Sequence, residues 1–175
     1  MPSFALAAIG RDRPGIVAAV AEVLYEQGCN VEDSSMTLLR GNFSIMLVLK
    51  SSPGTTAATL AESLRPACER MGLTYDVLDV EDTAGVPHPT HVLTVYGADR
   101  PGILYRVTEL LASAGVNITD LNSRLVGADT PVYALMLELS LPPSLEEDAI
   151  QRRLADVAAQ IGVDLTLSVR EDDLL

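Results

Sequence analysis

The first half of the chain alternates between strand-like and helix-like patterns of apolar residues. Residues 4–9 form a short apolar run that is typical of a buried strand. Apolar positions then recur at helical spacing over residues 16–27, and Gly28 ends the pattern as a glycine just beyond a helix often does. Residues 31–39 and 43–49 predict two further strands, and the Gly-Asn pair between them predicts a tight hairpin.

A second helix and a fourth strand complete this pattern. Residues 57–71 place apolar side chains on one helical face, and a strand follows at about residues 73–80. Pro66 lies inside the helical pattern, where its ring and its missing N–H disfavour a regular helix. We therefore expect the helix to kink or break at this proline.

The same order of elements recurs in the second half, because the chain contains an internal repeat. The segment Gly10–Ile16, GRDRPGI, returns at Gly97–Ile103 as GADRPGI. The second copy has extra residues within 127–132, where a hairpin loop tolerates added length. Its last helix is preceded by Ser144 and Glu147, which have the spacing of a capping box. The elements predicted for the second copy are 91–96, 103–114, 116–126, 132–141, 150–161 and 163–169.

Strand, helix, strand, strand, helix, strand is the order of a ferredoxin-like βαββαβ unit. We therefore expect an α+β protein with two such units, each a four-stranded antiparallel sheet with two helices on one face. The first unit is placed at residues 1–83, a short stiff linker rich in helix and strand breakers at 84–90, and the second unit at 91–175. The other face of each sheet would be bare in an isolated unit. We therefore expect units to join edge to edge or back to back, within a chain or between chains.

The composition narrows the classes of partner. The 175 residues include 24 Asp and Glu against 12 Lys and Arg, a net charge of -12, and both halves are acidic. No basic stripe is available to neutralise phosphates, so direct binding to nucleic acid or to an anionic membrane is disfavoured. Cys29 and Cys68 form no CxxC pair and are expected to be buried thiols. The sequence shows neither a secretory leader pattern nor a membrane-spanning apolar stretch, so we expect a cytoplasmic protein.

The tetrapeptide Asp-Arg-Pro-Gly occurs at residues 12–15 and 99–102, where a predicted strand turns into a predicted helix. Gly15 and Gly102 leave the opening turn without a side chain, so a ligand or a neighbouring backbone can approach its free N–H groups. Those donors and the helix dipole attract carboxylates. In the alternative interpretation, the two aspartates of the repeat simply cap their helices.

These motifs resemble those of tandem ACT-domain proteins, whose small βαββαβ modules sense amino acids. The resemblance covers nearly the whole chain as two copies. In each copy the Gly-x-Asp-Arg-Pro-Gly-Ile motif is followed by a second one, Gly28–Val31 or Gly115–Ile118, at the entry to the next strand. In length and organisation the chain most resembles the glycine cleavage system transcriptional repressor group of free-standing double-ACT regulators.

The resemblance implies a ligand site at an interface between two ACT units. In that family, amino acids are held by the loop after the first strand, the start of the first helix, and an Asn that leads into the second strand. Backbone N–H groups would take the α-carboxylate, and Asn or Asp oxygens would accept from the α-ammonium. The corresponding positions are Asp12, Arg13, Gly15 and Asn30 in the first copy, and Asp99, Arg100, Gly102 and Asn117 in the second.

The function implied is a non-enzymatic regulator that binds a small amino acid, forms a homo-oligomer, expected to be a dimer, and acts on a protein partner. That partner could be a transcription regulator of glycine metabolism. The alternative is a ligand-free ACT module for protein-protein interaction or dimerisation. The copies differ at Arg11 and Ala98 and at Ala18 and Tyr105, so the two sites need not bind the same ligand. Each Asn of the second motif also follows a Gly by two residues, where Asn is a good turn former.

Other chemistries have weaker support in the sequence. His88 and His91 lie at a Pro-containing linker without further metal ligands nearby. No His stands at a motif spacing from Ser34 or Ser35 to activate a nucleophile. Acylphosphatases share the βαββαβ order and use an Arg in an anion-cradling loop, but Asp12 and the acidic charge would repel a phosphate. We therefore expect no catalytic residues, no metal site and no cofactor.

Overall fold

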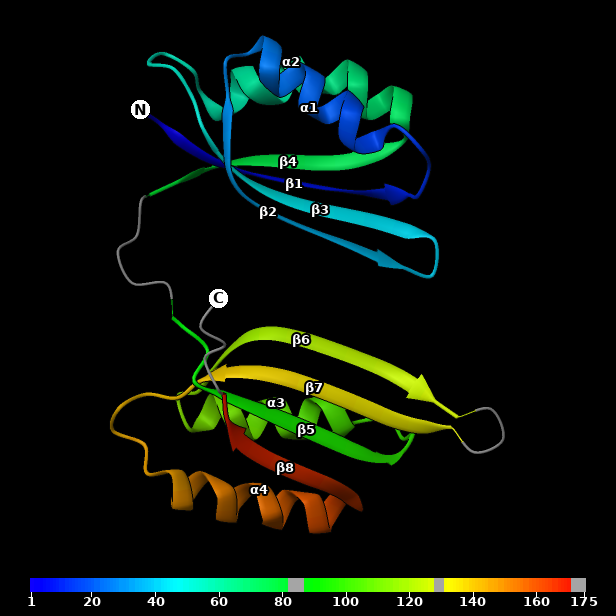
Figure 1. Cartoon of the computed structure of the whole chain (residues 1–175), viewed down its shortest axis with the longest axis vertical. Helices are drawn as coiled ribbons and strands as arrows, with labels where there is room; N and C mark the ends of the chain where they lie inside the picture. Colours follow the sequence, from blue (N-terminus) through cyan, green and yellow to red (C-terminus); the bar gives the residue numbers. More distant parts are fainter. Residues whose placement is uncertain (82–86, 128–130, 171–175) are drawn as a thin grey trace. The chain divides into compact units, whose positions relative to one another are not determined.

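The computed structural model of the chain (Figure 1) describes residues 1–81, 87–127 and 131–170. The chain divides into two compact units, Met1–Ala84 (unit 1) and Gly85–Leu175 (unit 2). Four expectations fall partly outside the described residues, namely the end of the first unit at 82–83, the start of the linker at 84–86, residues 128–130 of the longer hairpin loop and the end of the second unit at 171–175.

Unit 1 is a four-stranded antiparallel sheet with both helices on one face (Figure 1). Strand β1 pairs with β3 and β4, and β2 pairs with β3, so the strand order is β2-β3-β1-β4. The elements are β1 (Ser3–Arg11), α1 (Ile16–Glu26), β2 (Asn30–Leu39), β3 (Asn42–Lys50), α2 (Ala57–Met71) and β4 (Leu73–Val80).

Unit 2 repeats this arrangement with the strand order β6-β7-β5-β8. Its elements are β5 (His91–Ala98), α3 (Ile103–Ser113), β6 (Asn117–Val126), β7 (Val132–Ser140), α4 (Glu147–Ile161) and β8 (Val163–Val169). The predicted fold class of two βαββαβ units is confirmed. None of the helices in the described ranges is both long enough and apolar enough to span a membrane.

The two faces of each sheet differ because buried and exposed residues alternate along the strands. In β1, Phe4, Leu6 and Ala8 are buried in the core beneath the helices, whereas Ile9 is 55% exposed on the other face. We call the face away from the helices the open face. Each unit has its own apolar core. Because a fully buried leucine or phenylalanine contributes about 1.5–3 kcal/mol, these cores supply the main stabilisation of the units.

Helix α2 continues through Pro66, so the expected break does not occur. Pro66 is exposed, whereas Leu60, Leu64 and Cys68 of the same helix are buried in the core of unit 1. An internal proline costs a helix about 3 kcal/mol. Burial of the two leucines alone is enough to offset that cost, so tertiary packing keeps the segment helical where local preference opposes it.

The capping box lies on a different helix from the one predicted. Helix α4 begins after Glu146, which makes no side-chain cap within the described residues, so the predicted box of Ser144 and Glu147 is wrong. The helix starts too late for that box, whose serine would have to be the residue that precedes the helix. Helix α2 carries a box instead, because the side chains of Thr56 and Thr59 each accept from the other's backbone N–H, at 3.2 and 3.0 Å.

Candidate ligand-binding site

The first glycine of each motif lets the end of one strand lie close to its neighbour. A Cβ atom on Gly10 of β1 would lie 2.7 Å from the Gly72 carbonyl oxygen and 2.8 Å from Cδ2 of Leu73. A Cβ on Gly97 of β5 would lie 2.7 Å from Cγ1 of Val163. No side chain fits in either place. This close approach brings the loop after the first strand to the C-terminal end of the unit's second helix.

The second glycine of each motif begins the first helix of its unit. Gly15 and Gly102 are the N-cap residues of α1 and α3, with φ angles of 92° and 96° in the left-handed region. Neither cap has a side-chain hydrogen bond within the described residues, so the alternative in which Asp12 and Asp99 cap the helices is wrong. The intervening Arg-Pro pair separates each aspartate from the helix start.

The first turn of α1 presents backbone donors that are unused within the described chain. The N–H groups of residues 16–18 have no acceptor among the residues that the structure describes. The helix ladder starts with the Ala19 N–H, which donates to the Gly15 carbonyl at 2.9 Å. Helix α3 begins in the same way at Gly102. Free N–H groups at the positive end of a helix dipole attract an anion.

Asp12 precedes this turn with its carboxylate unpaired. Its backbone N–H donates to the Gly41 carbonyl at 2.9 Å, which ties the loop to the hairpin between β2 and β3. Across the described ranges, neither its carboxylate nor that of Asp99 makes a hydrogen bond or an ion pair. A free carboxylate followed by free N–H groups provides an acceptor and a set of donors, which together match the two charged groups of an amino acid.

The arginine of the motif is held by the second helix of its unit. Nη2 of Arg13 donates to the Arg70 carbonyl at 2.8 Å and lies 3.4 Å from the place that a Cβ of Gly72 would take. In unit 2, Nη1 of Arg100 lies 3.6 Å from the equivalent place at Gly162. These glycines are the C-caps of α2 and α4, so each guanidinium lies at the negative end of a helix dipole. Arg13 therefore fastens its loop to the helix end, and Arg100 occupies the same place in unit 2.

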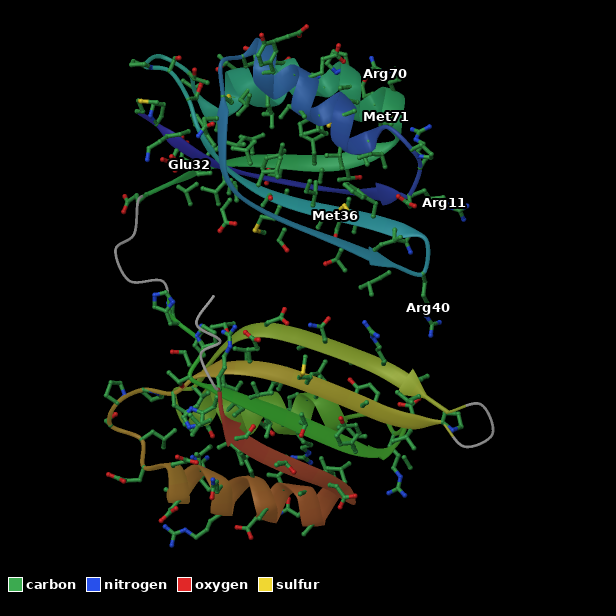
Figure 2. The ribbon with its side chains drawn as sticks, viewed as in Figure 1. Arg11, Glu32, Met36, Arg40, Arg70 and Met71 are labelled. Carbon is green, nitrogen blue, oxygen red and sulfur yellow. The ribbon has the colours of Figure 1, made fainter. Side chains whose placement is uncertain are left out.

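Asn30 lies at the opposite end of unit 1 from the loop. The register aligns Asn30 with Lys50 at the end of β3, whereas Arg11 aligns with Asn42 at its start. Eight residues of strand at ~3.3 Å each separate the two levels, about 26 Å in all. Figure 2 shows this separation, with Glu32 near the start of β2 at one end and Arg11 at the other.

Asn117 occupies the same place in unit 2, because it is the first residue of β6 and pairs with Ser140 at the end of β7. Each of the two asparagines opens a strand. The structure thus brings the Asp, Arg and Gly of each motif together and leaves the Asn of the same unit apart from them. A loop and an asparagine can share a site only when they come from different units.

A hollow of about 260 Å3 opens at the start of α3 in unit 2. It brings Arg100 and Gly102 together with Arg106 and Gln160, which no sequence motif marks. Arg106 follows Gly102 by one helical turn, so helical spacing could have indicated it. Gln160 comes from the second helix of the unit, and only the tertiary structure places it here.

In unit 1 a groove of about 300 Å3 runs between α1 and β2. Its lining is mainly apolar and includes Val17, Val31 and Met36, which are 49%, 43% and 55% exposed. Strand β2 is the edge of the sheet and is exposed along its whole length. Unit 1 therefore leaves an apolar edge uncovered beside the helix that carries the free N–H groups.

Tyr105 distinguishes the first turn of α3 from that of α1, which has Ala18 at the corresponding position. Its hydroxyl donates to Oε1 of Glu109 at 2.6 Å, and the guanidinium of Arg106 lies 5.9 Å from its ring centre. The hydrogen bond to Glu109, and then the charge of that carboxylate, raise the pKa of Tyr105. The tyrosine therefore stays a neutral donor at physiological pH, and unit 2 has the more polar first turn.

Two βαββαβ units that carry the same loop at the same turn define a recognisable class of protein. Residues 4–78 and 90–168 each match the family model of the ACT domain. The chain therefore belongs to the ACT domain family, as a tandem of two such domains.

The relatives include a transcriptional repressor and an enzyme. The chain is 28% identical over 172 residues to the glycine cleavage system transcriptional repressor of Escherichia coli K12, a match that covers 94% of this chain and 88% of the repressor. It is 30% identical over 164 residues to the phosphoserine phosphatase SerB2 of Mycobacterium tuberculosis, but that match covers only 38% of the phosphatase. This protein is thus a tandem ACT-domain protein related to the glycine cleavage repressor.

Solved structures show the same tandem fold. A protein of unknown function from Galdieria sulphuraria matches with a TM-score of 0.83 and 25% identity, covering 97% of this chain and 99% of that one. A structure assigned provisionally to a glycine cleavage system transcriptional repressor matches with a TM-score of 0.73 over 98% of both chains. At 18% identity, the second match shows the fold alone.

Proposed function

We propose that this protein is a non-enzymatic regulator that binds a small amino acid through its Asp-Arg-Pro-Gly loops and thereby modulates a protein partner. The observation that carries the proposal is the uncapped first turn of α1, whose free N–H groups follow the unpaired carboxylate of Asp12. Similarity to the E. coli repressor along almost the whole chain supports a regulatory role. A transcription regulator of glycine metabolism is the partner that this similarity favours.

The loop offers both halves of the recognition of an amino acid. The α-carboxylate would accept from the N–H groups of residues 16–18, and the α-ammonium would donate to Asp12. Such charge-assisted hydrogen bonds are roughly twice as strong as neutral ones. Arg13 serves by holding the loop against α2, through its bond to the Arg70 carbonyl. Residues 99–102 would fill the same roles in unit 2.

Asn30 joins this site when the β2 edges of two copies of the chain pair antiparallel. The start of one β2 then lies beside the end of the other, so Asn30 of one copy comes near Leu39 of the second copy. Leu39 leads into the hairpin whose Gly41 carbonyl holds the Asp12 N–H. The side-chain carbonyl of Asn30 can then accept from the ligand's α-ammonium. Asn117, at the start of β6, would complete the second site in the same way.

A shared site of this kind couples ligand binding to association. A ligand can shift an equilibrium only by its differential affinity for the two states, and here the paired state alone offers the complete set of partners. Occupancy would therefore change which edges and helix surfaces are free for a partner.

The first experiment is a thermal unfolding screen of the full chain against each of the twenty amino acids. A true ligand at 100 times its Kd adds about 2.7 kcal/mol of stability. We expect Asn30→Ala together with Asn117→Ala to abolish that stabilisation and to leave the ligand-free unfolding temperature unchanged, since both side chains are exposed. Thr37→Ala, also exposed on β2, is the matched control and should keep the response.

Mixing two variants tests whether the site is shared between copies. Here Asn117→Ala is present in every chain, so that only the unit 1 site is observed. Neither the Asn30→Ala chain nor the Asp12→Asn chain should then bind the amino acid alone. Each mixed dimer regains one intact site, formed by Asp12 of one chain and Asn30 of the other. Binding by either variant on its own, or no recovery on mixing, would contradict the shared site.

One observation favours an alternative function, in which the chain associates through its ACT units without binding any ligand. Met36 and Leu38 of β2 are 55% and 52% exposed on the helix side of the edge, where they could bury against a second unit without any ligand. This alternative predicts an association that none of the twenty amino acids alters, and no thermal shift in the screen.

A further inference from the structure

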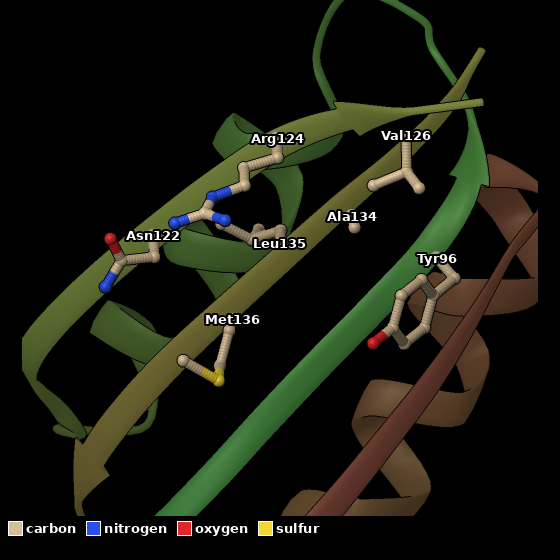
Figure 3. A pocket seen from close by; sticks show the side chains of 7 residues that line it. All are labelled: Tyr96, Asn122, Arg124, Val126, Ala134, Leu135 and Met136. Atoms are coloured by element: carbon tan, nitrogen blue, oxygen red, sulfur yellow. The ribbon is translucent and has the colours of Figure 1, made fainter. Parts of the chain in front are cut away.

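The open face of the unit 2 sheet carries a hollow of about 400 Å3 (Figure 3). Figure 3 shows Arg124 of β6, Met136 of β7 and Tyr96 of β5 around it. Leu135 and Leu137 of β7 are buried in the core with the helices, so the exposed Met136 between them lies on the opposite face. The hollow is lined by Tyr96, Asn122, Arg124, Val126, Ala134, Leu135 and Met136.

Arg124 has no partner among the residues that the structure describes. The nearest acidic residue along β6, Asp120, lies four residues before Arg124 and already accepts from Nδ2 of Asn122 at 2.6 Å. The Tyr96 hydroxyl is likewise without a hydrogen bond in the described ranges. The Arg124 guanidinium is therefore available to a carboxylate of another chain. Arginine, tyrosine and methionine are also the residue types enriched where proteins meet.

The register places an acid on the same rung of this face. Arg124 pairs with Ala134, Ala134 with Tyr96, and Tyr96 with Asp164 of β8. Directly opposed residues of an antiparallel sheet project to the same side. One rung of the open face therefore runs from a cation at one edge, through a small and an aromatic residue, to an anion at the other edge. Asp164 also lacks a partner in the described part of the chain.

Unit 1 lacks this arrangement. The same rung of its open face consists of Thr37, Ser44, Ile9 and Thr74, which carry no charge. The difference lies between two copies of one fold in a single chain, so the fold itself does not require the charged pair. The uncharged positions of unit 1 can therefore serve as matched controls.

We propose that the open face of unit 2 binds the same face of a second copy of this chain, with the strands of the two sheets aligned. The twofold axis runs parallel to the strands, midway between the two facing sheets and over the gap between β7 and β5. It places β6 of one copy over β8 of the other. Arg124 then meets Asp164 of the second copy, and the large Tyr96 packs over the small Ala134. Each contact occurs twice, as an isologous interface requires.

The next rung supports the same pairing. Asn122 aligns with Met136, Met136 with Thr94, and Thr94 with Thr166 of β8. The same axis therefore places Asn122 over Thr166 and Met136 over Thr94, a polar pair and a pair of side chains with apolar ends. Aligned packing of two sheets about 10 Å apart is a standard geometry.

The face is large enough for a specific contact. Four strands about 4.8 Å apart and about eight residues of ~3.3 Å each cover roughly 500 Å2 on each copy. Two copies would bury roughly 1,000 Å2 together, at the lower end of specific interfaces. The face is separate from the Asp-Arg-Pro-Gly loops, and its contacts use side chains of the open face rather than the backbone groups that edge pairing of β2 or β6 would use, so this association does not depend on the amino-acid site.

The test is analytical ultracentrifugation of the full chain over a range of concentrations, without added amino acids. We expect Arg124→Glu and Asp164→Arg each to weaken one association step at least tenfold, because each places like charges together. The double variant Arg124→Glu/Asp164→Arg restores the charge pair and should recover the association. Thr74→Arg, at the position of unit 1 that is equivalent to Asp164, should leave it unchanged.

Three results would overturn the proposal: association that neither single variant weakens, no recovery in the double variant, or a chain that stays monomeric at all concentrations. Circular dichroism checks that each variant is folded. Should a charge reversal unfold unit 2, Arg124→Gln and Asp164→Asn remove the charges without reversing them and must still weaken the same step. Loss of the amino-acid response with this step intact would count against the proposed function alone.

Discussion

Gly10 illustrates how one missing side chain sets the geometry of the loop that follows it. Its neighbours across the sheet are the Gly72 carbonyl and the Leu73 side chain, each within 3 Å of the place that a Cβ would take. Backbone and a buried leucine cannot move aside without strain. The glycine thus positions the loop that holds Asp12 and Arg13, although it lies outside the proposed ligand contacts.

Substitution Gly10→Ala is expected to destabilise unit 1 by about 2–3 kcal/mol, because it overpacks a site with no free volume. Urea unfolding of the full chain measures the loss. Thiol labelling of Cys68 provides a local probe, since burial in the unit 1 core raises the pKa of this thiol and keeps it unreactive until the unit opens.

Gly41→Ala is the matched control for backbone strain without a clash. Gly41 has φ +76 and nothing within 4 Å of its Cβ position, so alanine there costs only about 1 kcal/mol for a left-handed residue. If Gly10→Ala cost no more than Gly41→Ala, close approach would not be the reason for the glycine in the motif.

Helix α2 shows at the scale of an element how packing outweighs local preference. Pro66 cannot donate to the carbonyl of Glu62, one turn earlier, and its ring disfavours the helix at that point. The buried face, with Leu60, Leu64 and Cys68, nevertheless holds the segment in one helix from Ala57 to Met71.

Pro66→Ala is therefore expected to stabilise unit 1 by about 1–2 kcal/mol. It restores a helical hydrogen bond, and this gain exceeds the ~1 kcal/mol of chain entropy that proline removes from the unfolded state. Thermal or urea unfolding measures the change. The reciprocal substitution Asp156→Pro, at the corresponding exposed position of α4, should destabilise unit 2 by about 3 kcal/mol. Loss of stability in Pro66→Ala would show that the proline serves the helix.

The charge of the whole molecule bears on how a regulator of this kind reaches its target. A net charge of -12 opposes the approach to a phosphate backbone, and counterion release, the main driving force for nonspecific DNA binding, is unavailable to it. A transcriptional role would therefore act through a protein partner that itself contacts DNA.

We accordingly expect the isolated protein to show no shift of promoter DNA in a gel assay at about 0.15 M salt, with or without amino acids. Lowering the salt should not rescue binding, because it strengthens the repulsion between like charges. A tight, salt-resistant complex with DNA alone would contradict this assignment of the partner.

The sequence by itself determined the repeat, the order of elements and the fold class, because hydrophobic periods and turn residues are local signals. It also located the Asp-Arg-Pro-Gly loops, since a motif that occurs twice at helix starts stands out without any structure. Local signals did not determine the helix caps, since the N-cap of α4 is Glu146 and not Ser144, and Thr56 forms an unexpected box.

Only the tertiary structure decided which groups meet. Strand register sets Asn30 about 26 Å from the loop of its own unit. The carbonyl of Arg70 at the end of α2 accepts from Arg13, and one rung of the unit 2 sheet carries Arg124 at one edge and Asp164 at the other. In each case the two groups lie far apart in the sequence, and their distance depends on how strands pair and helices pack, which periodicity along the chain does not encode.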